Sequence, residues 1–261
     1  MADDGTDLRS VLAKREDILA SLAESPARKP ELVDELSVSR STVDRAIGEL
    51  TDVDCVVADG STYSVTKTGR LALAERTEYV AGTDAIGRAS GLLKHLPATA
   101  EISPAFLKGA SVTRSEPHAP DRAAAASASL LTEATKMKGL APTVLKSDVF
   151  TVDGELERDE LTVEIVAERG VIDSLRSFPA APTESLLGRE SLSLYESETN
   201  LPYALWIMEA PAGDHAGITV HDSGGSVAGV IMTQSEPALR WANEQYREYK
   251  RKASCVAVAP E

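Results

Sequence analysis

The clearest alternation of hydrophobic and polar positions lies between Lys29 and Leu50, KPELVDELSVSRSTVDRAIGEL. Its second half places apolar residues at i, i+3, i+4 and i+7, which form one stripe along a helix. The members of this stripe are Val43, Ala46, Ile47 and Leu50. Ser39 precedes them at the position of an N-cap, where a hydroxyl accepts a hydrogen bond from the first turn. The pattern predicts two short helices joined by a tight turn.

Polar side chains at the start of the second helix predict a DNA contact surface. Ser39, Arg40, Ser41, Thr42 and Arg45 lie off the apolar stripe or in the first turn. Side chains at the open end of a recognition helix contact phosphates and base edges in a major groove. The alternative is an ordinary solvated face on a helical hairpin, because this pattern also arises by chance.

The flanking segments extend the hairpin to a winged helix. Apolar residues at helical spacing predict a first helix over residues 6–23, and Pro30 suits the first turn of the second. Within residues 53–65, two β-branched runs flank Asp59-Gly60, which predicts a β-hairpin. Thr62 and Tyr63 near its tip are candidate contacts to the DNA backbone, and so is Lys67 in the first turn of a fourth helix that Thr66 caps. A winged helix used only for protein contacts remains the alternative.

The rest of the chain predicts a linker and a second domain. Residues 81–96 have a helical pattern interrupted by glycines, and residues 97–108 form a connector. Helices are expected at residues 121–137, 170–178 and 236–252, with a helical turn at 147–150 and a turn at Asp153-Gly154. Strands are expected at residues 110–113, 140–145, 161–166, 191–195, 203–209, 218–221 and 227–232. This order predicts a mixed α/β sheet, and a chain divided into residues 1–80, 81–96 and 97–261.

Candidate chemistry in the second domain is sparse. His215 and His221 lie near acidic residues, but their spacing matches no metal motif, and polar strand ends explain them equally well. The sequence contains no nucleophile elbow, P-loop, dinucleotide fingerprint or HExxH motif. We therefore expect no catalytic residue, no metal and no cofactor. Trp206 and Trp241 predict large buried packing positions, with ligand stacking as the alternative.

One loop offers a candidate ligand site. Arg114, His118 and Arg122 surround a turn-rich segment that follows the first strand of the second domain. Loops at strand ends bind ligands in open α/β sheets. These three side chains could meet a small anionic metabolite, and the alternative is a solvated basic loop.

Charge and composition limit the partners. The net charge is −14, from 27 basic and 41 acidic residues, and the acidic excess is spread over both halves. Few lysines with many acidic residues, Ala and Val resemble the surfaces of proteins from extreme halophiles. No apolar run reaches the ~18 residues of a membrane span, so we expect a cytoplasmic protein without a membrane partner. Two distant cysteines predict neither a disulfide framework nor a zinc site.

The motifs together resemble a known family. SVSRSTVDRAIGEL and VTKTGRLAL resemble archaeal winged-helix regulators, while LPYALWIMEA, VHDSGGSVAGVI and EPALRWANEQYREYKRKA resemble the methanogenesis-regulatory family, which is abundant in halophilic archaea. The resemblance implies an N-terminal DNA-binding domain with Ser39–Arg45 as recognition positions. It also implies a C-terminal regulatory domain of phospholipase-D-like fold. The His-x-Lys signature of phospholipase-D enzymes is absent, because none of the four histidines has Lys two positions later.

These observations favour a sequence-specific transcription regulator. Its partner would be an operator in double-stranded DNA, bound by a homodimer on two half-sites, and residues 97–261 would sense an effector or mediate assembly. The rival hypotheses are a small-molecule-processing α/β enzyme with an accessory winged helix and a protein-interaction adaptor.

Overall fold

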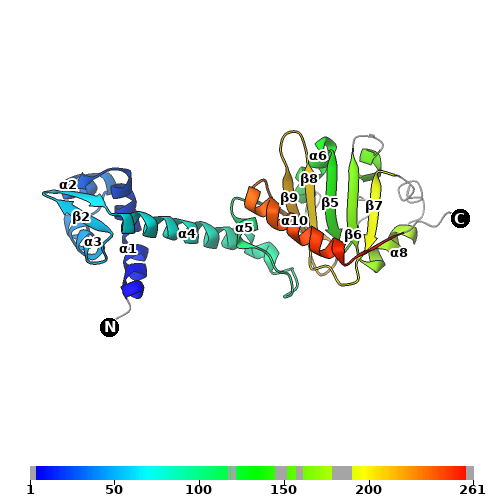
Figure 1. The fold of residues 1–261 in the computed structure, drawn as a ribbon, viewed down its shortest axis with the longest axis horizontal. Coiled ribbons are helices and arrows are strands. Elements are labelled where there is room, and N and C mark those ends of the chain that lie inside the picture. The colour runs from blue at the N-terminus through cyan, green and yellow to red at the C-terminus, as the bar shows by residue number, and fades with distance from the viewer. Residues whose placement is uncertain are drawn as a thin grey trace. The chain divides into compact units, whose positions relative to one another are not determined.

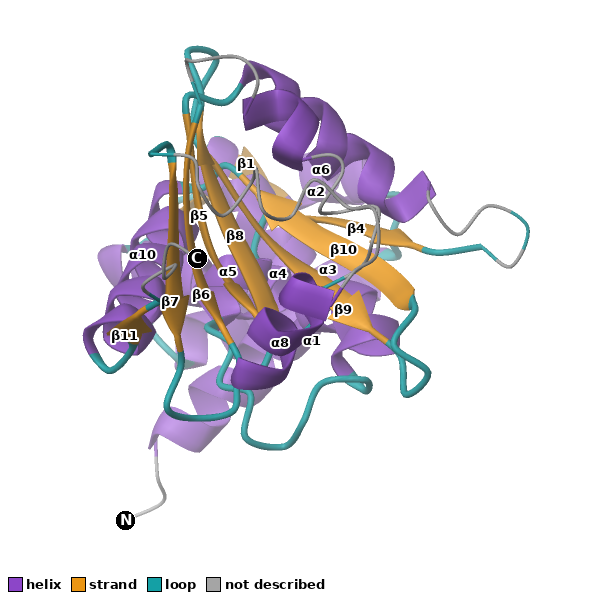
Figure 2. Ribbon diagram, turned by 90° about the vertical axis from the view of Figure 1, so that its right-hand side faces the viewer, coloured by secondary structure: helices purple, strands orange, loops and turns teal. Residues whose placement is uncertain are grey.

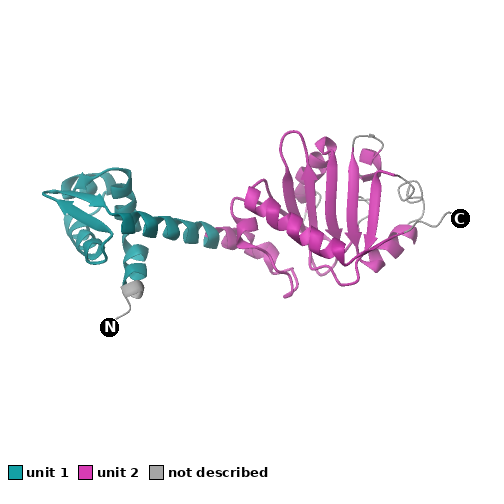
Figure 3. Ribbon diagram, in the orientation of Figure 1, with its two compact units in different colours: residues 1–83 teal, residues 84–261 magenta. Residues whose placement is uncertain are grey.

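The structure is a computed structural model. It describes residues 4–116, 118, 122–144, 152–156, 161–177 and 190–256. Two compact units divide the chain, residues 1–83 and residues 84–261 (Figure 3), and each has its own buried apolar core. Within the described residues, no helix combines the length and apolar character needed to cross a membrane.

The first unit is a helical bundle with a small antiparallel sheet. Its elements are α1 (Asp4–Glu24), β1 (Ala27–Arg28), α2 (Lys29–Leu36), α3 (Arg40–Asp52), β2 (Val56–Asp59), β3 (Thr62–Val65) and α4 (Lys67–Leu93), the last of which continues into the second unit. The sheet has the order β1-β3-β2. This is the winged helix-turn-helix arrangement that the sequence predicted.

The predicted apolar stripe of α3 forms the centre of the first core. Val43, Ala46 and Leu50 are fully buried, and Ile47 is nearly so. They pack with Leu19 and Leu32 of the two preceding helices. Burial of a side chain of this kind stabilises a fold by about 1.5–3 kcal/mol, so this stripe fixes α3 against α1 and α2.

The hairpin differs from the prediction by one residue. Asp59 pairs with Thr62 across the turn, so the two turn residues are Gly60 and Ser61 rather than Asp59 and Gly60. Gly60 has a φ of 59°, a left-handed conformation that glycine adopts without steric cost. A further short strand, β1, pairs with β3, and the sequence pattern did not reveal it.

The expected fourth helix and linker helix are one helix, α4. A glycine within a helix costs about 1 kcal/mol relative to alanine, but Ala85, Ala89 and Leu92 are buried along one face and hold the helix together. Gly91 also has a packing role, because a Cβ atom there would lie 2.8 Å from Cζ of Arg114.

The second unit is built on one large mixed sheet. After α4, its elements are α5 (Pro104–Leu107), β4 (Ser111–Arg114), α6 (Arg122–Glu133), β5 (Lys136–Ala141), β6 (Thr162–Ala167), α8 (Arg169–Ser177), β7 (Leu192–Glu196), β8 (Ala204–Glu209), β9 (His215–His221), β10 (Val227–Thr233), α10 (Glu236–Arg251) and β11 (Ser254–Cys255). The strand order is β11-β7-β6-β5-β8-β9-β10-β4. The pairs β5–β6 and β6–β7 are parallel, and the other pairs are antiparallel.

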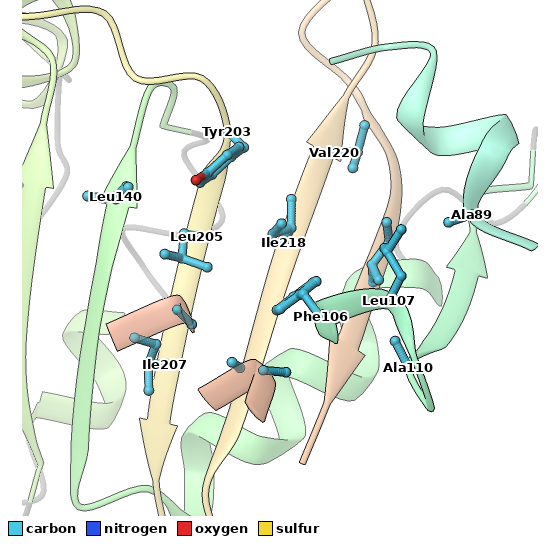
Figure 4. Packing of buried hydrophobic residues seen from close by; sticks show 14 of the residues in the cluster. Ala89, Phe106, Leu107, Ala110, Leu140, Tyr203, Leu205, Ile207, Ile218 and Val220 are labelled. Atoms are coloured by element: carbon cyan, nitrogen blue, oxygen red, sulfur yellow. The ribbon is translucent and has the colours of Figure 1, made fainter. Parts of the chain in front are cut away.

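Helices cover both faces of this sheet. α10 crosses one face (Figure 1), whereas α6 and α8 lie on the other (Figure 2). Successive residues of a strand point to opposite faces, and β8 shows this clearly: Leu205 and Ile207 belong to the core under α10, while Trp206 and Met208 belong to the core under α6 and α8. Figure 4 shows part of the core under α10, where strand residues meet Phe106 and Leu107 of α5.

Several predicted boundaries in this unit were wrong. The helix expected over residues 121–137 ends at Glu133, and the strand expected over residues 140–145 is β5, which begins at Lys136. β5 pairs with β6 on one side and β8 on the other, so these ladders outweigh the helical propensity of residues 136–137. Asp153-Gly154 lies in a helical segment, residues 152–156, instead of a turn. The helical turn expected at 147–150 lies outside the described residues.

The two cysteines occupy opposite environments. Cys55 is fully buried in the core of the first unit, where burial raises the pKa of its thiol and the Asp54 carboxylate adds to the effect. Cys255 is exposed on β11. Both are free thiols.

Candidate nucleic-acid interface

The first turn of α3 is capped as the sequence predicted. The Thr42 amide donates a hydrogen bond of 3.1 Å to Oγ of Ser39. Oγ of Ser39 also lies 2.9 Å from Oγ of Ser41 and 2.8 Å from Oγ1 of Thr42. Three hydroxyls therefore cluster at the open end of the helix, where unpaired amides favour an approaching anion.

The turn before α3 directs this end outward. Ser37 ends α2 in a left-handed conformation, with φ 53° and ψ 37°. Arg40, Ser41 and Arg45 are exposed, and Thr42 is half-buried. Because the opposite face of α3 is buried, the long arginine side chains extend from the exposed face of a fixed helix.

Lys29 links α2, on which it lies, to α3 and β3. Its Nζ lies 2.8 Å from Oδ1 of Asp44 and 5.4 Å from the centre of the Tyr63 ring. The hydrogen bond from Lys29 is the main cause that holds the pKa of the Asp44 carboxyl below its ordinary value. Lys29 therefore neutralises the acid in the exposed part of α3 and joins it to the wing.

The predicted wing contacts are less exposed than residues at the tip of a hairpin. Thr62 and Tyr63 are half-buried in β3, and Tyr63 pairs with Ala27 of β1. Lys67 is exposed at the start of α4. Thr66 caps that helix as expected, since its Oγ1 accepts from the Gly69 amide at 3.0 Å.

A second ion pair lies at the start of α2. The Arg28 amide donates a 2.7 Å hydrogen bond to Oε2 of Glu31, and the Arg28 side chain pairs with the same carboxylate. This pairing lowers the pKa of Glu31. The sequence patterns revealed neither residue. Lys29 pairs with Asp44 only because α2 packs beside α3, whereas the Arg28–Glu31 pair is a local capping box whose spacing could have been found in the sequence.

The predicted ligand residues of the second unit have separate surroundings. Arg114 donates from Nη2 to the Arg88 carbonyl at 3.0 Å. Arg122 is exposed and forms a 3.3 Å ion pair with Glu116, so an anion would compete with that carboxylate. His118 is exposed in a turn.

Of the two histidines considered for a metal site, His215 contacts the backbone. Its Nδ1 lies 3.1 Å from the Gly213 carbonyl. Over the part of the chain that the structure describes, no three His, Cys, Asp or Glu side chains gather in a way that could hold a metal ion. Trp206 is buried, and Trp241 is half-buried against the rings of Phe106 and Tyr203.

Among solved structures, the chain is similar to TrmBL2, an archaeal chromatin protein, with 14% identity and a TM-score of 0.43 over 94% of this chain and 92% of that one. It is also similar to Nuc from Salmonella typhimurium, a phospholipase D family member, with 11% identity and a TM-score of 0.41 over 56% of this chain and 98% of that one. NucT from Helicobacter pylori gives 10% identity and a TM-score of 0.41 over 56% and 97%. The search of curated proteins finds no match.

Two family models match the sequence. The HVO_A0261 N-terminal domain matches residues 3–88, which span the winged helix and most of α4. The middle domain of the methanogenesis regulatory protein FilR1 matches residues 120–252, half of the chain. These matches confirm the resemblance inferred from the sequence motifs: the chain belongs to the family of the methanogenesis regulatory protein FilR1.

Proposed function

We propose that this chain is a sequence-specific, DNA-binding transcription regulator whose first unit reads DNA with α3. One observation carries the proposal. The first turn of α3 is capped by Ser39 and exposes Arg40, Ser41 and Arg45, while the apolar face of the same helix is buried. A helix held in this way presents its N-terminal side chains to a major groove.

Each side chain has a suited role in this proposal. Arg40 and Arg45 have the length and donor geometry to bind guanine or phosphate. Ser41 and Thr42 suit close contacts in the groove, while Ser39 maintains the cap. Thr62, Tyr63 and Lys67 would contact the sugar-phosphate backbone.

Local neutralisation supports DNA binding by an acidic chain. With about six phosphate contacts, log affinity falls by about five units for each tenfold rise in salt. The Lys29–Asp44 pair neutralises a carboxylate on α3 beside the proposed surface, and the Arg28–Glu31 pair neutralises another at the start of α2. In concentrated salt, base-edge contacts from the arginines would supply most of the affinity.

We further propose that two copies bind two half-sites, because one winged helix buries little DNA surface. α4 carries Leu71, Tyr79 and Ile86, which are exposed apolar residues spaced about two helical turns apart. Residues at this spacing lie near one face of a helix, and that face could pack against α4 of a second copy. Sedimentation at high salt should give a dimer, and Tyr79→Glu should shift it towards monomer.

The second unit would supply regulation. A ligand controls a regulator only if it binds the DNA-competent and incompetent states with different affinity. Arg114, His118 and Arg122 remain our candidates for a small anionic metabolite, with a solvated loop as the alternative. In a thermal-shift screen of such metabolites, Arg122→Ala should lose the stabilisation, whereas Arg240→Ala, which removes another exposed ion pair, should keep it.

The central experiment maps the operator by crosslinking in cells and then measures binding of the full chain to that sequence. Arg45→Ala and Arg40→Ala should each weaken binding about tenfold or more, as expected for loss of a bidentate base contact. Arg247→Ala removes the same charge from an exposed position on α10 and should leave affinity unchanged. Equal affinity of all three variants and the wild type would overturn the placement of α3 on DNA.

A further inference from the structure

The second unit contains a cavity of about 480 Å³, open to solvent, between the sheet and the helices α6 and α8. We infer that it is a binding site for a small, uncharged and mainly apolar molecule that carries one hydrogen-bond acceptor. The site concerns the second unit alone, so it goes beyond the proposed function and does not depend on DNA binding.

The cavity arises from the small side chains of α6. This helix lines it with Ala124, Ala125, Ser127 and Ala128, and only Leu131 is large. Strand side chains of ordinary size therefore lie opposite a helix with little side-chain volume. Protein interiors are otherwise close-packed, and a space of this size is within the range of about 300–1,000 Å³ that is typical of small-molecule sites.

Trp206 supports one part of the cavity. Its ring lies against β9 at Gly217, where a Cβ atom would be 2.1 Å from Cζ2 of the ring. Its Nε1 donates a 3.3 Å hydrogen bond to Oγ1 of Thr219. The ring is therefore held against β9 at two points, and an aromatic surface in a fixed position is well suited to an apolar ligand.

The lining selects against charged ligands. Among the described residues that line the cavity, none is Lys, Arg, Asp or Glu. An ionic group that contacts this apolar lining would lose part of its hydration without gaining a countercharge from these residues, which is unfavourable. An anionic metabolite would therefore bind elsewhere, and this cavity would take a neutral molecule.

A few polar groups can orient the ligand. Ser127, Thr143, Thr219 and His221 also line the cavity. The Ser127 hydroxyl already donates to the Ala124 carbonyl at 2.8 Å. The Thr219 oxygen accepts from Trp206, and its own hydroxyl hydrogen can then be donated to a ligand. This pairing is the reason for expecting a single acceptor, such as a carbonyl or ether oxygen.

The test uses 6-propionyl-2-(dimethylamino)naphthalene, a neutral and mainly apolar fluorophore whose ketone oxygen is the hydrogen-bond acceptor, with the full chain. Fluorescence titration should give saturable binding with one site per chain. In a Trp241→Phe variant the only remaining tryptophan is Trp206, and its emission should change over the same concentration range. Glucose 6-phosphate should not displace the probe.

Variants of α6 locate the site. Ala124→Leu and Ala128→Leu add methylene groups inside the cavity and should each raise the probe Kd about tenfold. Ala126→Leu makes the same change on the same helix at a position outside the described lining and should leave the Kd unchanged.

Two results would overturn the inference. The first is the absence of saturable probe binding to the wild type. The second is an equal Kd in the wild type, Ala124→Leu and Ala128→Leu when all three give the same circular dichroism spectrum. Arg45→Ala should lose DNA binding and still bind the probe normally, because the two sites lie in different units. Failure of one proposal can therefore be distinguished from failure of the other.

Discussion

The ammonium of Lys29 on α2 lies 2.8 Å from the carboxylate of Asp44 on α3. This pair places a neutralised acid beside the side chains proposed to meet DNA. Lys29→Ala should leave the Asp44 charge to repel phosphates and weaken operator binding about fivefold at low salt, with less effect as salt screens the charge. Filter binding or fluorescence anisotropy at several salt concentrations measures the change.

A double variant provides the control for this pair. If repulsion by Asp44 causes the loss, then Lys29→Ala combined with Asp44→Ala should regain most of the affinity. A double variant as weak as Lys29→Ala would show that Lys29 contacts the DNA directly.

The Ser39 cap should contribute to stability as well as to position. Ser39→Ala removes the acceptor for the Thr42 amide and should lower the free energy of unfolding of the first unit by about 1 kcal/mol. Ser41→Ala removes a neighbouring hydroxyl but leaves this hydrogen bond in place, so the free energy of unfolding should hardly change. Denaturant unfolding followed by circular dichroism distinguishes the two.

Gly217 should tolerate no side chain. In Gly217→Ala the new methyl group would meet the Trp206 ring at 2.1 Å, and relief of this overlap should cost about 1–3 kcal/mol. Gly170→Ala, at a helical position with nothing within 4 Å of the added Cβ, should leave the thermal midpoint unchanged or slightly higher. Equal midpoints for both variants would contradict the described packing of Trp206.

Stability should fall in acid because of Glu164. Its carboxylate accepts a 2.6 Å hydrogen bond from the Tyr246 hydroxyl and another from Lys250 on α10. Partial burial raises the pKa of Glu164, but these two donors outweigh burial and leave the pKa below its ordinary value of 4.5. A lowered folded-state pKa means that the stabilisation is fully present above pH 4.5 and is lost as pH falls through the folded-state value.

The measurement is thermal unfolding between neutral pH and about pH 3, the region around and below an ordinary Glu pKa. Glu164→Gln should lower stability at pH 7 by about 1–3 kcal/mol, and its remaining pH dependence below pH 4.5 should be shallower than that of the wild type. Glu244→Gln, at an exposed position on the same helix as Lys250, should behave as wild type.

The first unit could be predicted well because its signals are local. The apolar stripe of α3, the Ser39 cap and the glycine of the hairpin are each defined by residues close together in the sequence. Because the local propensities there agree with the fold, these features could be predicted from the sequence. β1 could not be predicted, because two residues form a strand only when β3 lies beside them. The pairing of Lys29 with Asp44 depends on packing in the same way.

The second unit was harder to predict. The general architecture followed from the order of strands and helices, but the start of β5 is set by ladders to strands far along the chain. The cavity under α6 was also missed. Its signal in the sequence is the run of alanines in residues 123–126, which lies within the helix predicted over residues 121–137 and leaves little side-chain volume opposite the sheet.

The contrast between Cys55 and Cys255 gives this protein a built-in chemical probe. A maleimide dye should attach rapidly at Cys255 on β11, while Cys55 stays protected in the core of the winged helix until that unit opens. The slow second alkylation would then report how often the unit unfolds, with no engineered residue. Operator DNA that binds only the folded unit should slow that second reaction while leaving the first unchanged.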